Sequence, residues 1–183
     1  MVSLADSLLT QAFTLAAVSR YNWFHPNHCK ERGMLRKARQ QDVPFIHSLL
    51  AEYAAKGELL ARPLTDIYEF LRDFVIAEDQ SGVVVGVCGL HLCWEDLSEV
   101  RSLAVSPARR GEGWGTRLAE AAISEAVTLG FNQVFALTYR PAFFARLGFK
   151  EVDKGRLPHK IWADCVHCVK FPACDEIAML LEL

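Results

Sequence analysis

The chain has 183 residues, of which 51% are hydrophobic and 23% charged, so it can bury the core of one domain. The formal net charge of -2, with both signs dispersed, gives no reason to expect binding to nucleic acid or to an anionic membrane surface. No apolar run approaches the roughly 18 to 20 residues that span a bilayer. The N-terminus lacks the basic region of an export signal, which predicts a cytoplasmic protein whose six cysteines are reduced or bind a metal.

Residues 1–33 differ from the rest because they contain polar residues and an aromatic patch without a long periodic pattern. The peptide Lys30-Glu31-Arg32-Gly33 is also what a purine-rich ribosome-binding sequence would encode. We therefore expect an N-terminal extension that is either disordered or the product of a wrongly assigned start, with Met34 as the natural first residue. The predicted domain covers residues 34–183.

The first half of this domain predicts strands and two helices. A strand is expected over 35–38, followed by a helix over 43–56 that Asp42 would cap and Gly57 would end. A second helix is expected from Asp66, because apolar residues recur at helical spacing at Ile67, Phe70, Leu71 and Phe74. Further strands are expected over 75–78, 83–94 and 99–105.

The second half begins with a glycine-rich segment, 110–115, that precedes an amphipathic helix over 116–129. A buried strand over 134–138 follows, and then a helix after Pro141. Two final strands are expected over 149–152 and 176–183. The order of elements predicts an α/β fold of the α+β type, with one mixed sheet in a single domain.

The glycine-rich segment has the composition of a site for an anion. Gly111, Gly113 and Gly115 lack the β-carbons that would keep a ligand away from backbone N–H groups at a helix N-terminus, and Arg110 adds a positive charge. The segment lacks the Gly-Lys-Ser/Thr ending of a nucleoside-triphosphate loop and the G-x-G-x-x-G spacing of a dinucleotide site. A glycine-rich surface loop is the alternative.

The pattern Val105-x-Pro107-x-x-Arg110-Gly111-x-Gly113-x-Gly115 resembles the pyrophosphate loop of the GNAT N-acetyltransferase superfamily, and the order of elements is that of the GNAT fold. This resemblance implies acetyl-CoA as co-substrate and a strand backbone N–H that stabilises the oxyanion when an amine attacks the acetyl carbonyl. The Trp114 ring is expected to pack on the helix or the sheet instead of on adenine. The implied cofactor-binding residues are Leu103, Ala104, Val105, Arg110, Gly111, Gly113, Trp114, Gly115 and Thr116.

Three other segments, 35–42, 56–62 and 99–105, resemble the acetyltransferase domain of N-acetylglutamate synthases. The amino-acid kinase domain of the long synthases is absent from this sequence, so the resemblance is to the short, stand-alone type. It implies transfer of acetyl to the α-amine of L-glutamate, the first step of arginine biosynthesis. Another small amine or a protein N-terminus as acceptor, or a catalytically weak regulatory module that binds CoA or metal, are the alternatives.

Glutamate has two carboxylates, so its site needs cationic side chains in a partly dry pocket. Arg62 matches the family arginine that holds the substrate carboxylate. Arg101 is a second candidate, because strand alternation would place Glu99, Arg101 and Leu103 on one face. The alternatives are a solvated loop charge for Arg62 and an ion pair with Glu99 for Arg101.

Glu99 and Tyr139 are the candidates for proton transfer. Glu99 would take the amine proton, directly or through one water, although a structural carboxylate is the alternative. The usual GNAT acid is a tyrosine in a Tyr-x-x-x-Gly-Phe pattern, and this chain has Phe144 at that position. Tyr139 is the nearest replacement for this acid. The alternatives are that Tyr139 only packs in the structure, or that the thiolate leaves without an enzymatic acid.

A cysteine-rich segment, 158–175, contains Cys165, Cys168 and Cys174 together with His159 and His167. Cysteines at this spacing can hold a structural zinc with one histidine. The alternatives are reduced thiols packed near the acceptor, and redox chemistry or an iron-sulfur cluster. The position before the last strand suits a lid that sets substrate choice. A homodimer is also left open, because GNAT proteins often form dimers.

Overall fold

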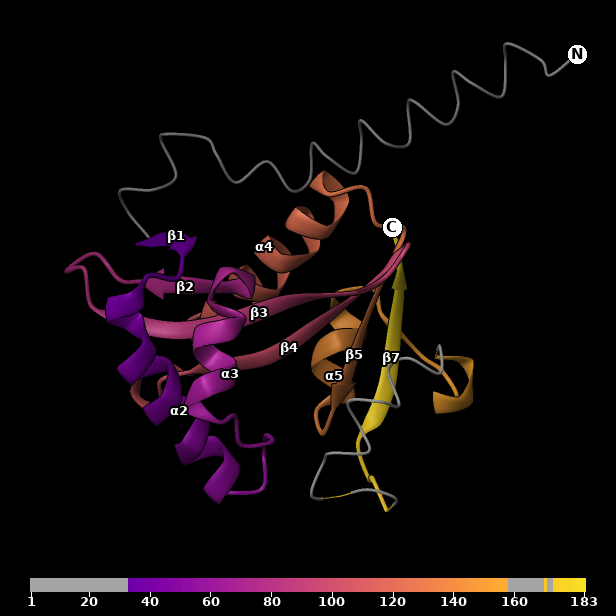
Figure 1. The fold of residues 1–183 in the computed structure, drawn as a ribbon, viewed down its shortest axis with the longest axis horizontal. Coiled ribbons are helices and arrows are strands. Elements are labelled where there is room, and N and C mark those ends of the chain that lie inside the picture. The colour runs from indigo at the N-terminus through magenta and orange to yellow at the C-terminus, as the bar shows by residue number, and fades with distance from the viewer. Residues whose placement is uncertain (1–32, 158–169, 171–172) are drawn as a thin grey trace, which may run out of the picture.

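The computed structural model describes residues 33–157, 170 and 173–183. They form a seven-stranded mixed sheet with helices packed on both faces (Figure 1), which confirms the predicted fold class. In these residues no helix is long and apolar enough to cross a membrane. The extension that we predict over residues 1–33 lies outside the described residues, apart from Gly33.

The first half of the sheet is an antiparallel run of neighbours. Its strands are β1 (Met34–Lys37), β2 (Phe74–Glu78), β3 (Val84–Trp94) and β4 (Leu97–Val105). The connection from β1 to β2 contains α2 (Val43–Ala55) and α3 (Leu64–Glu69). Both helices pack on one face of the sheet, in front of it in Figure 1.

The second half adds two helices and three strands. They are α4 (Trp114–Thr128), β5 (Gln133–Thr138), α5 (Pro141–Arg146), β6 (Lys150–Glu151) and β7 (Ile177–Glu182). The strand order across the sheet is β1-β2-β3-β4-β5-β7-β6, so the C-terminal strand lies inside the sheet, between β5 and β6.

The parallel pairing between β4 and β5 is short. It covers Leu97 to Glu99 of β4 and Gln133 to Phe135 of β5. Beyond these residues the two strands separate, and in the described part of the chain no strand pairs with the β5-facing edge of β4 from Val100 onward. The separation exposes backbone groups in the middle of the sheet, where they would otherwise be paired.

Apolar clusters stabilise both faces of the sheet. The face under α4 and α5 buries Leu118, Ala122 and Ala126, which confirms the predicted apolar face of the α4 helix. The other face buries side chains of α2 and α3 together with Ala104. Each fully buried aliphatic side chain contributes about 1.5–3 kcal/mol relative to an exposed one.

The predicted second helix is wrong in its extent. The α3 helix ends at Glu69, a 3₁₀ turn covers Leu71–Asp73, and Phe74 begins β2. Ile67 and Phe74 are both buried in the same cluster, although they enter it from a helix and a strand. Their helical spacing therefore reflects a shared core and not a continuous helix.

Asp42 does not cap α2 with its side chain, contrary to expectation. Its carboxylate accepts hydrogen bonds from the Arg36 guanidinium at 2.6 and 2.8 Å and from the Arg39 backbone at 2.7 Å. The hydrogen bond from Arg36 is the main reason why the pKa of Asp42 lies below its usual value. Arg36 also pairs with Glu78, so this buried group joins β1 to β2 and to the start of α2.

Candidate active site

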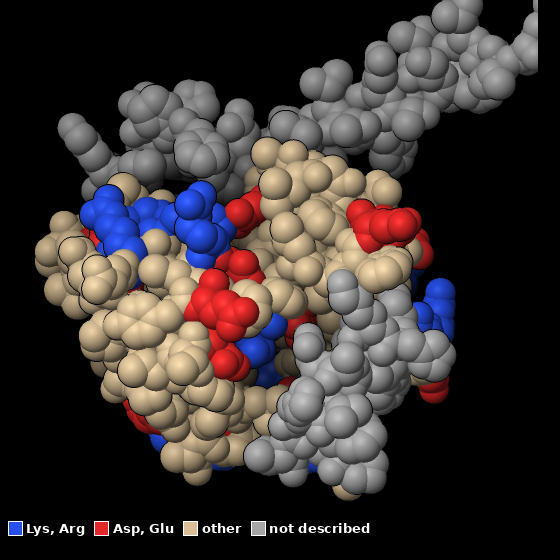
Figure 2. All heavy atoms as spheres, viewed as in Figure 1, with Lys and Arg blue, Asp and Glu red and all other residues tan. Residues whose placement is uncertain are grey.

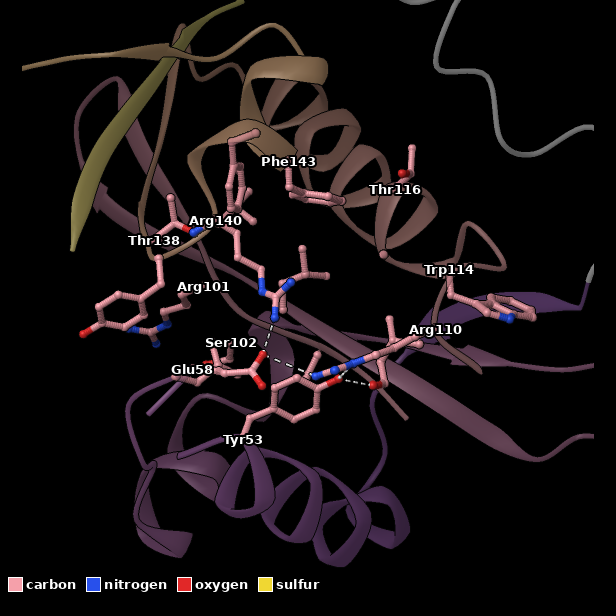
Figure 3. Close-up of a pocket in the computed structure, with 18 of the residues that line it drawn as sticks. Tyr53, Glu58, Arg101, Ser102, Arg110, Trp114, Thr116, Thr138, Arg140 and Phe143 are labelled. Carbon is pink, nitrogen blue, oxygen red and sulfur yellow. Dashed lines mark hydrogen bonds and ion pairs between the residues drawn. The ribbon is translucent and has the colours of Figure 1, made fainter. Parts of the chain in front are cut away.

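A cleft of about 440 Å³ opens where β4 and β5 separate. Its walls come from the end of α2, from β4, from the glycine-rich loop and from the segment between β5 and α5 (Figure 3). Figure 2 shows acidic and basic side chains close together around the hollow in the middle of this face. A concave site with few, convergent polar groups is the usual form of a small-ligand site.

Every residue predicted to bind the cofactor lines this cleft. The set comprises Leu103, Ala104, Val105, Arg110, Gly111, Gly113, Trp114, Gly115 and Thr116. They are contiguous in space because the chain passes from the end of β4, which pairs with β3 but not with β5, through the loop and directly into α4.

The glycine-rich loop needs glycine at two positions for conformational reasons. Gly111 and Gly113 have φ of 84° and 83°, a region that other residues rarely adopt. The α4 helix begins immediately after Gly113. The N–H groups of a first helical turn have no partner within the helix and carry its partial positive charge, so this end of the cleft suits an anion.

The Trp114 ring packs into the core, as we expected. Its exposed fraction is 5%, and its Nε1 donates to Glu112 at 3.1 Å. The Arg117 guanidinium lies 4.5 Å from the ring centroid. These contacts of Trp114 with the core, with Glu112 and with Arg117 therefore fix the first residue of α4 in place.

Arg110 is held by side chains from α2 and the loop that follows it. Its Nε donates to the Tyr53 hydroxyl at 2.9 Å, and the guanidinium lies 4.8 Å from the centroid of the Tyr53 ring. The Tyr53 hydroxyl in turn donates to the backbone carbonyl of Val105. Sequence analysis missed Tyr53, because its spacing in α2 is that of an ordinary buried residue.

Glu58 lies across the middle of the cleft, between Arg110 and Arg140 (Figure 3). Its ion pair with Arg110 measures 3.3 Å, and Arg140 also donates to the same oxygen. The hydrogen bond from Arg140 is the largest cause of the lowered pKa of Glu58. No local signal predicts this contact, since Glu58 and Arg140 are 82 residues apart.

A bulge at Ser102 changes the direction of side chains along β4. Ser102 has φ of 54°, and the pairing of β4 with β3 shifts register at this point. Arg101 contacts the ring of Phe70, the residue after α3, whereas Leu103 packs against the cluster under α4. The prediction that Glu99, Arg101 and Leu103 share one face is therefore wrong for Leu103.

Arg101 is buried at the end of the cleft opposite Trp114 (Figure 3). It pairs with Asp73 at 3.3 Å and with Glu99 at 4.0 Å, so the ion pair we gave as an alternative exists. Among the described residues, its Nε has no hydrogen-bond partner. Burial, followed by the nearby charge of Arg62, lowers the pKa of Arg101.

Arg62 reaches the same end from the loop between α2 and α3. Its Nε donates to the Ser102 hydroxyl at 3.2 Å. Within the described part of the chain, Arg62 makes no ion pair with a carboxylate, and it does not line the cleft directly. The structure thus brings the two predicted carboxylate-binding arginines together on either side of the bulge.

The two candidates for proton transfer differ in their position relative to the cleft. Glu99 neighbours Arg101 but does not line the cleft, whereas Tyr139 lines it. The Tyr139 hydroxyl donates to Asp175 at 3.0 Å and accepts from Lys170. Burial raises the pKa of Tyr139, and the hydrogen bond from Lys170 opposes this.

Phe144 occupies the position of the usual tyrosine and is a core residue. Its exposed fraction is 6%, and its ring makes edge contacts with Phe143 and Phe149 at centroid distances of 5.2 Å. It has no proton to give, so an acid must come from elsewhere or is not needed.

Glu176 is a cleft residue that sequence analysis missed. It lies just before β7, lines the cleft beyond Tyr139, and is 9% exposed. Burial is the main cause of its raised pKa, and the charge of Glu99 adds to it. The available signal was a carboxylate placed directly before the apolar strand 177–182.

The predicted metal site remains a prediction. His159, Cys165, His167 and Cys168 lie outside the described residues, and Cys174 alone is described. In the described ranges no three His, Cys, Asp or Glu side chains are grouped as a metal site requires.

Comparison with known proteins gives the family. Residues 34–149 match the acetyltransferase (GNAT) family. The chain is 42% identical over 149 residues to an uncharacterized N-acetyltransferase of Chlorobaculum tepidum, which covers 81% of this chain and 96% of that protein. It is also 42% identical over 130 residues to an amino-acid acetyltransferase of Mycobacterium tuberculosis, covering 70% and 73%.

Among solved structures, the fold is similar to N-acetylglutamate synthase from Neisseria gonorrhoeae complexed with coenzyme A and N-acetyl-glutamate. The TM-score is 0.73 at 27% identity, over 82% of this chain and 35% of that one. The chain belongs to the GNAT acetyltransferase family. The protein is therefore an N-acetyltransferase. The predicted resemblance to the short type of amino-acid acetyltransferase is confirmed.

Proposed function

We propose that the protein transfers the acetyl group of acetyl-CoA to the α-amine of L-glutamate, the first step of arginine biosynthesis. Binding of coenzyme A by the similar synthase from Neisseria gonorrhoeae supports the co-substrate. The N-acetyl-glutamate in the same structure supports the acceptor.

Acetyl-CoA would bind along the end of the cleft formed by the glycine-rich loop. The N-terminus of α4 and Arg110 supply positive charge for its pyrophosphate. The pantetheine arm would follow the unpaired edge of β4, where it takes the place of a neighbouring strand. The Val105 carbonyl already accepts a hydrogen bond from Tyr53, so this oxygen is not available to the arm.

One observation favours a dicarboxylate acceptor over other amines. Arg62 and Arg101 lie close enough for their charges to repel, and the buried Arg101 Nε has no partner among the described residues. An unpartnered buried donor costs about 1–3 kcal/mol, which a bound carboxylate oxygen would recover. Two guanidinium groups match the two carboxylates of glutamate in number, and each can bind a carboxylate through two donors.

In the proposed reaction, the acceptor amine attacks the thioester carbonyl carbon. The C–N bond forms, the C–S bond breaks, and coenzyme A leaves as the thiolate. A backbone N–H of β4 would stabilise the oxyanion, an effect worth about 3 kcal/mol in comparable sites. Glu99, directly or through one water, would take the proton of the amine, and Tyr139 would return one to the thiolate.

The test is free-thiol release from acetyl-CoA across a panel of amino acids, with the wild type and Arg62→Ala side by side. We expect turnover with L-glutamate and a rise in its KM of about tenfold or more in the variant, with the KM of acetyl-CoA unchanged. Arg72→Ala is the control, because Arg72 is exposed and lies away from the cleft. Turnover with another amine only, or indifference to Arg62, would move the assignment to a different acceptor.

A further inference from the structure

The acceptor end of the cleft contains a buried negative charge that the proposed chemistry does not yet use. Glu176 is over nine-tenths buried and faces the cleft that Arg101 also lines. Within the described residues its carboxylate has a single hydrogen bond, from the Cys174 thiol at 3.8 Å, and no ion pair within 4.0 Å.

Such a carboxylate is costly to maintain. Removal from water penalises its charge, and a thiol is a weak donor that offsets little of this penalty. The charge of Glu99 adds repulsion, while Lys170 and Lys154 act on Glu176 only at longer range. A cation that enters through the cleft would relieve both effects.

We propose that Glu176 binds the ammonium group of the acceptor amino acid, opposite the arginines that bind its carboxylates. The proposal rests on a cationic and an anionic side chain that both line this cleft and are both incompletely paired. Arg101 offers an unpartnered Nε on β4, and Glu176 offers a carboxylate at the start of β7. These strands are separated by β5, so the two charges face the space between β4 and β5 from different sides.

This inference rests on the proposed function and adds a selectivity rule to it. Compounds with carboxylates but no amine would satisfy the arginines and leave Glu176 unpaired. Simple amines would pair with Glu176 and leave the Arg101 Nε without a partner. Only a zwitterionic amino acid pairs both, and its ammonium is then held on the side of the site from which it must approach the thioester.

The experiment compares two ligands that differ only in the amine. L-glutamate is assayed as substrate, and glutarate, the same five-carbon dicarboxylate without an amine, is assayed as a competitive inhibitor. In Glu176→Gln we expect the KM of glutamate to rise about tenfold, while the inhibition constant of glutarate stays the same or falls. Arg101→Lys should weaken both ligands together.

Glu182→Gln is the matched control, because Glu182 lies on the same strand, β7, and is exposed at its far end. Calorimetric binding of coenzyme A establishes that each variant is folded. Glu176→Asp, which keeps the charge, should recover part of the glutamate KM. A general packing defect would not be rescued in this way.

Equal weakening of glutamate and glutarate in Glu176→Gln, or an unchanged glutamate KM, would overturn the inference and leave the proposed function intact. If the wild type prefers another amino acid, the same comparison is made with that acceptor and its deaminated analogue. A wild type that acetylates no amino acid would overturn both proposals.

Discussion

The Tyr53 hydroxyl donates a hydrogen bond to the backbone carbonyl of Val105, and so joins the end of α2 to the end of β4. The same oxygen accepts from Arg110, whose guanidinium lies over the tyrosine ring. One side chain thus fixes both the strand end and the cationic group of the predicted pyrophosphate site. Tyr53 is 7% exposed, so its ring is also part of the core.

Tyr53→Phe removes the hydroxyl and leaves the ring in place. We expect the KM of acetyl-CoA to rise about fivefold, because a hydrogen bond of this kind contributes about 1 kcal/mol. The glutamate KM and kcat should change little. Tyr68→Phe is the control, since Tyr68 is 49% exposed on α3. A Tyr53 variant with normal acetyl-CoA kinetics would show that Arg110 does not need this support.

Gly113→Ala would test the conformation of the glycine-rich loop. A φ of 83° costs a residue with a β-carbon about 1 kcal/mol, so the unfolding midpoint should fall. The KM of acetyl-CoA should rise as well, because Gly113 precedes the first N–H groups of α4. Gly130→Ala provides the comparison: Gly130 has φ of 86° and follows the other end of α4, so it should show the same strain without the kinetic effect.

Glu58→Gln would release Arg110 and Arg140 from their shared carboxylate. We expect the KM of acetyl-CoA to be about two- to fivefold lower in the variant at low ionic strength. In the wild type, Glu58 would compete with the pyrophosphate of acetyl-CoA for Arg110. High salt should remove most of the difference, since these groups are partly exposed and their ion pairs are screened. An equal KM in variant and wild type at low salt would contradict the competition.

Asp42→Asn would test the buried ion pair with Arg36. At neutral pH we expect a loss of about 3 kcal/mol in the free energy of unfolding, because Arg36 would lose the buried one of its two carboxylate partners. The pKa of Asp42 is lower in the folded than in the unfolded state. The stability from this carboxylate is therefore complete above its unfolded pKa of about 3.9 and is lost as the pH falls through the folded pKa.

Urea unfolding as a function of pH measures this effect. The gap between the wild type and Asp42→Asn should be constant at neutral pH and should narrow below about pH 4. Asp96→Asn, at an exposed position between β3 and β4, should leave the curve unchanged. A gap that stays constant down to the acid transition would assign the loss to packing and not to charge.

Much of the fold could be predicted, because its strands and its α4 helix follow simple periods. The glycine-rich loop was also predictable, since the positive φ values of Gly111 and Gly113 require the residue type that the sequence shows. The helix after Asp66 was not, because Phe74 continues a helical spacing from within a strand. Asp42 was misjudged for a related reason: a cap depends on local sequence, while Arg36 competes for the same carboxylate.

The site was less predictable where it depends on contacts between distant segments. The position of Glu58 between Arg110 and Arg140 has no local signature, and neither has the approach of Glu176 to the cleft. The bulge at Ser102 is another case, because serine rarely has a positive φ and nothing near it in the sequence demands one.

The bulge at Ser102 inserts one extra residue into β4 and so changes which side chains face each side of the sheet. Arg101 contacts Phe70, the residue after α3, whereas Leu103 and Val105 pack against the cluster under α4. In the proposed function, the stretch 99–101 would therefore contact the acceptor and the stretch 103–105 would contact acetyl-CoA. Deletion of Ser102 would remove the bulge and leave Leu103, Ala104 and Val105 on the faces that they have now, because Ser102 is the extra residue between two regular stretches of pairing.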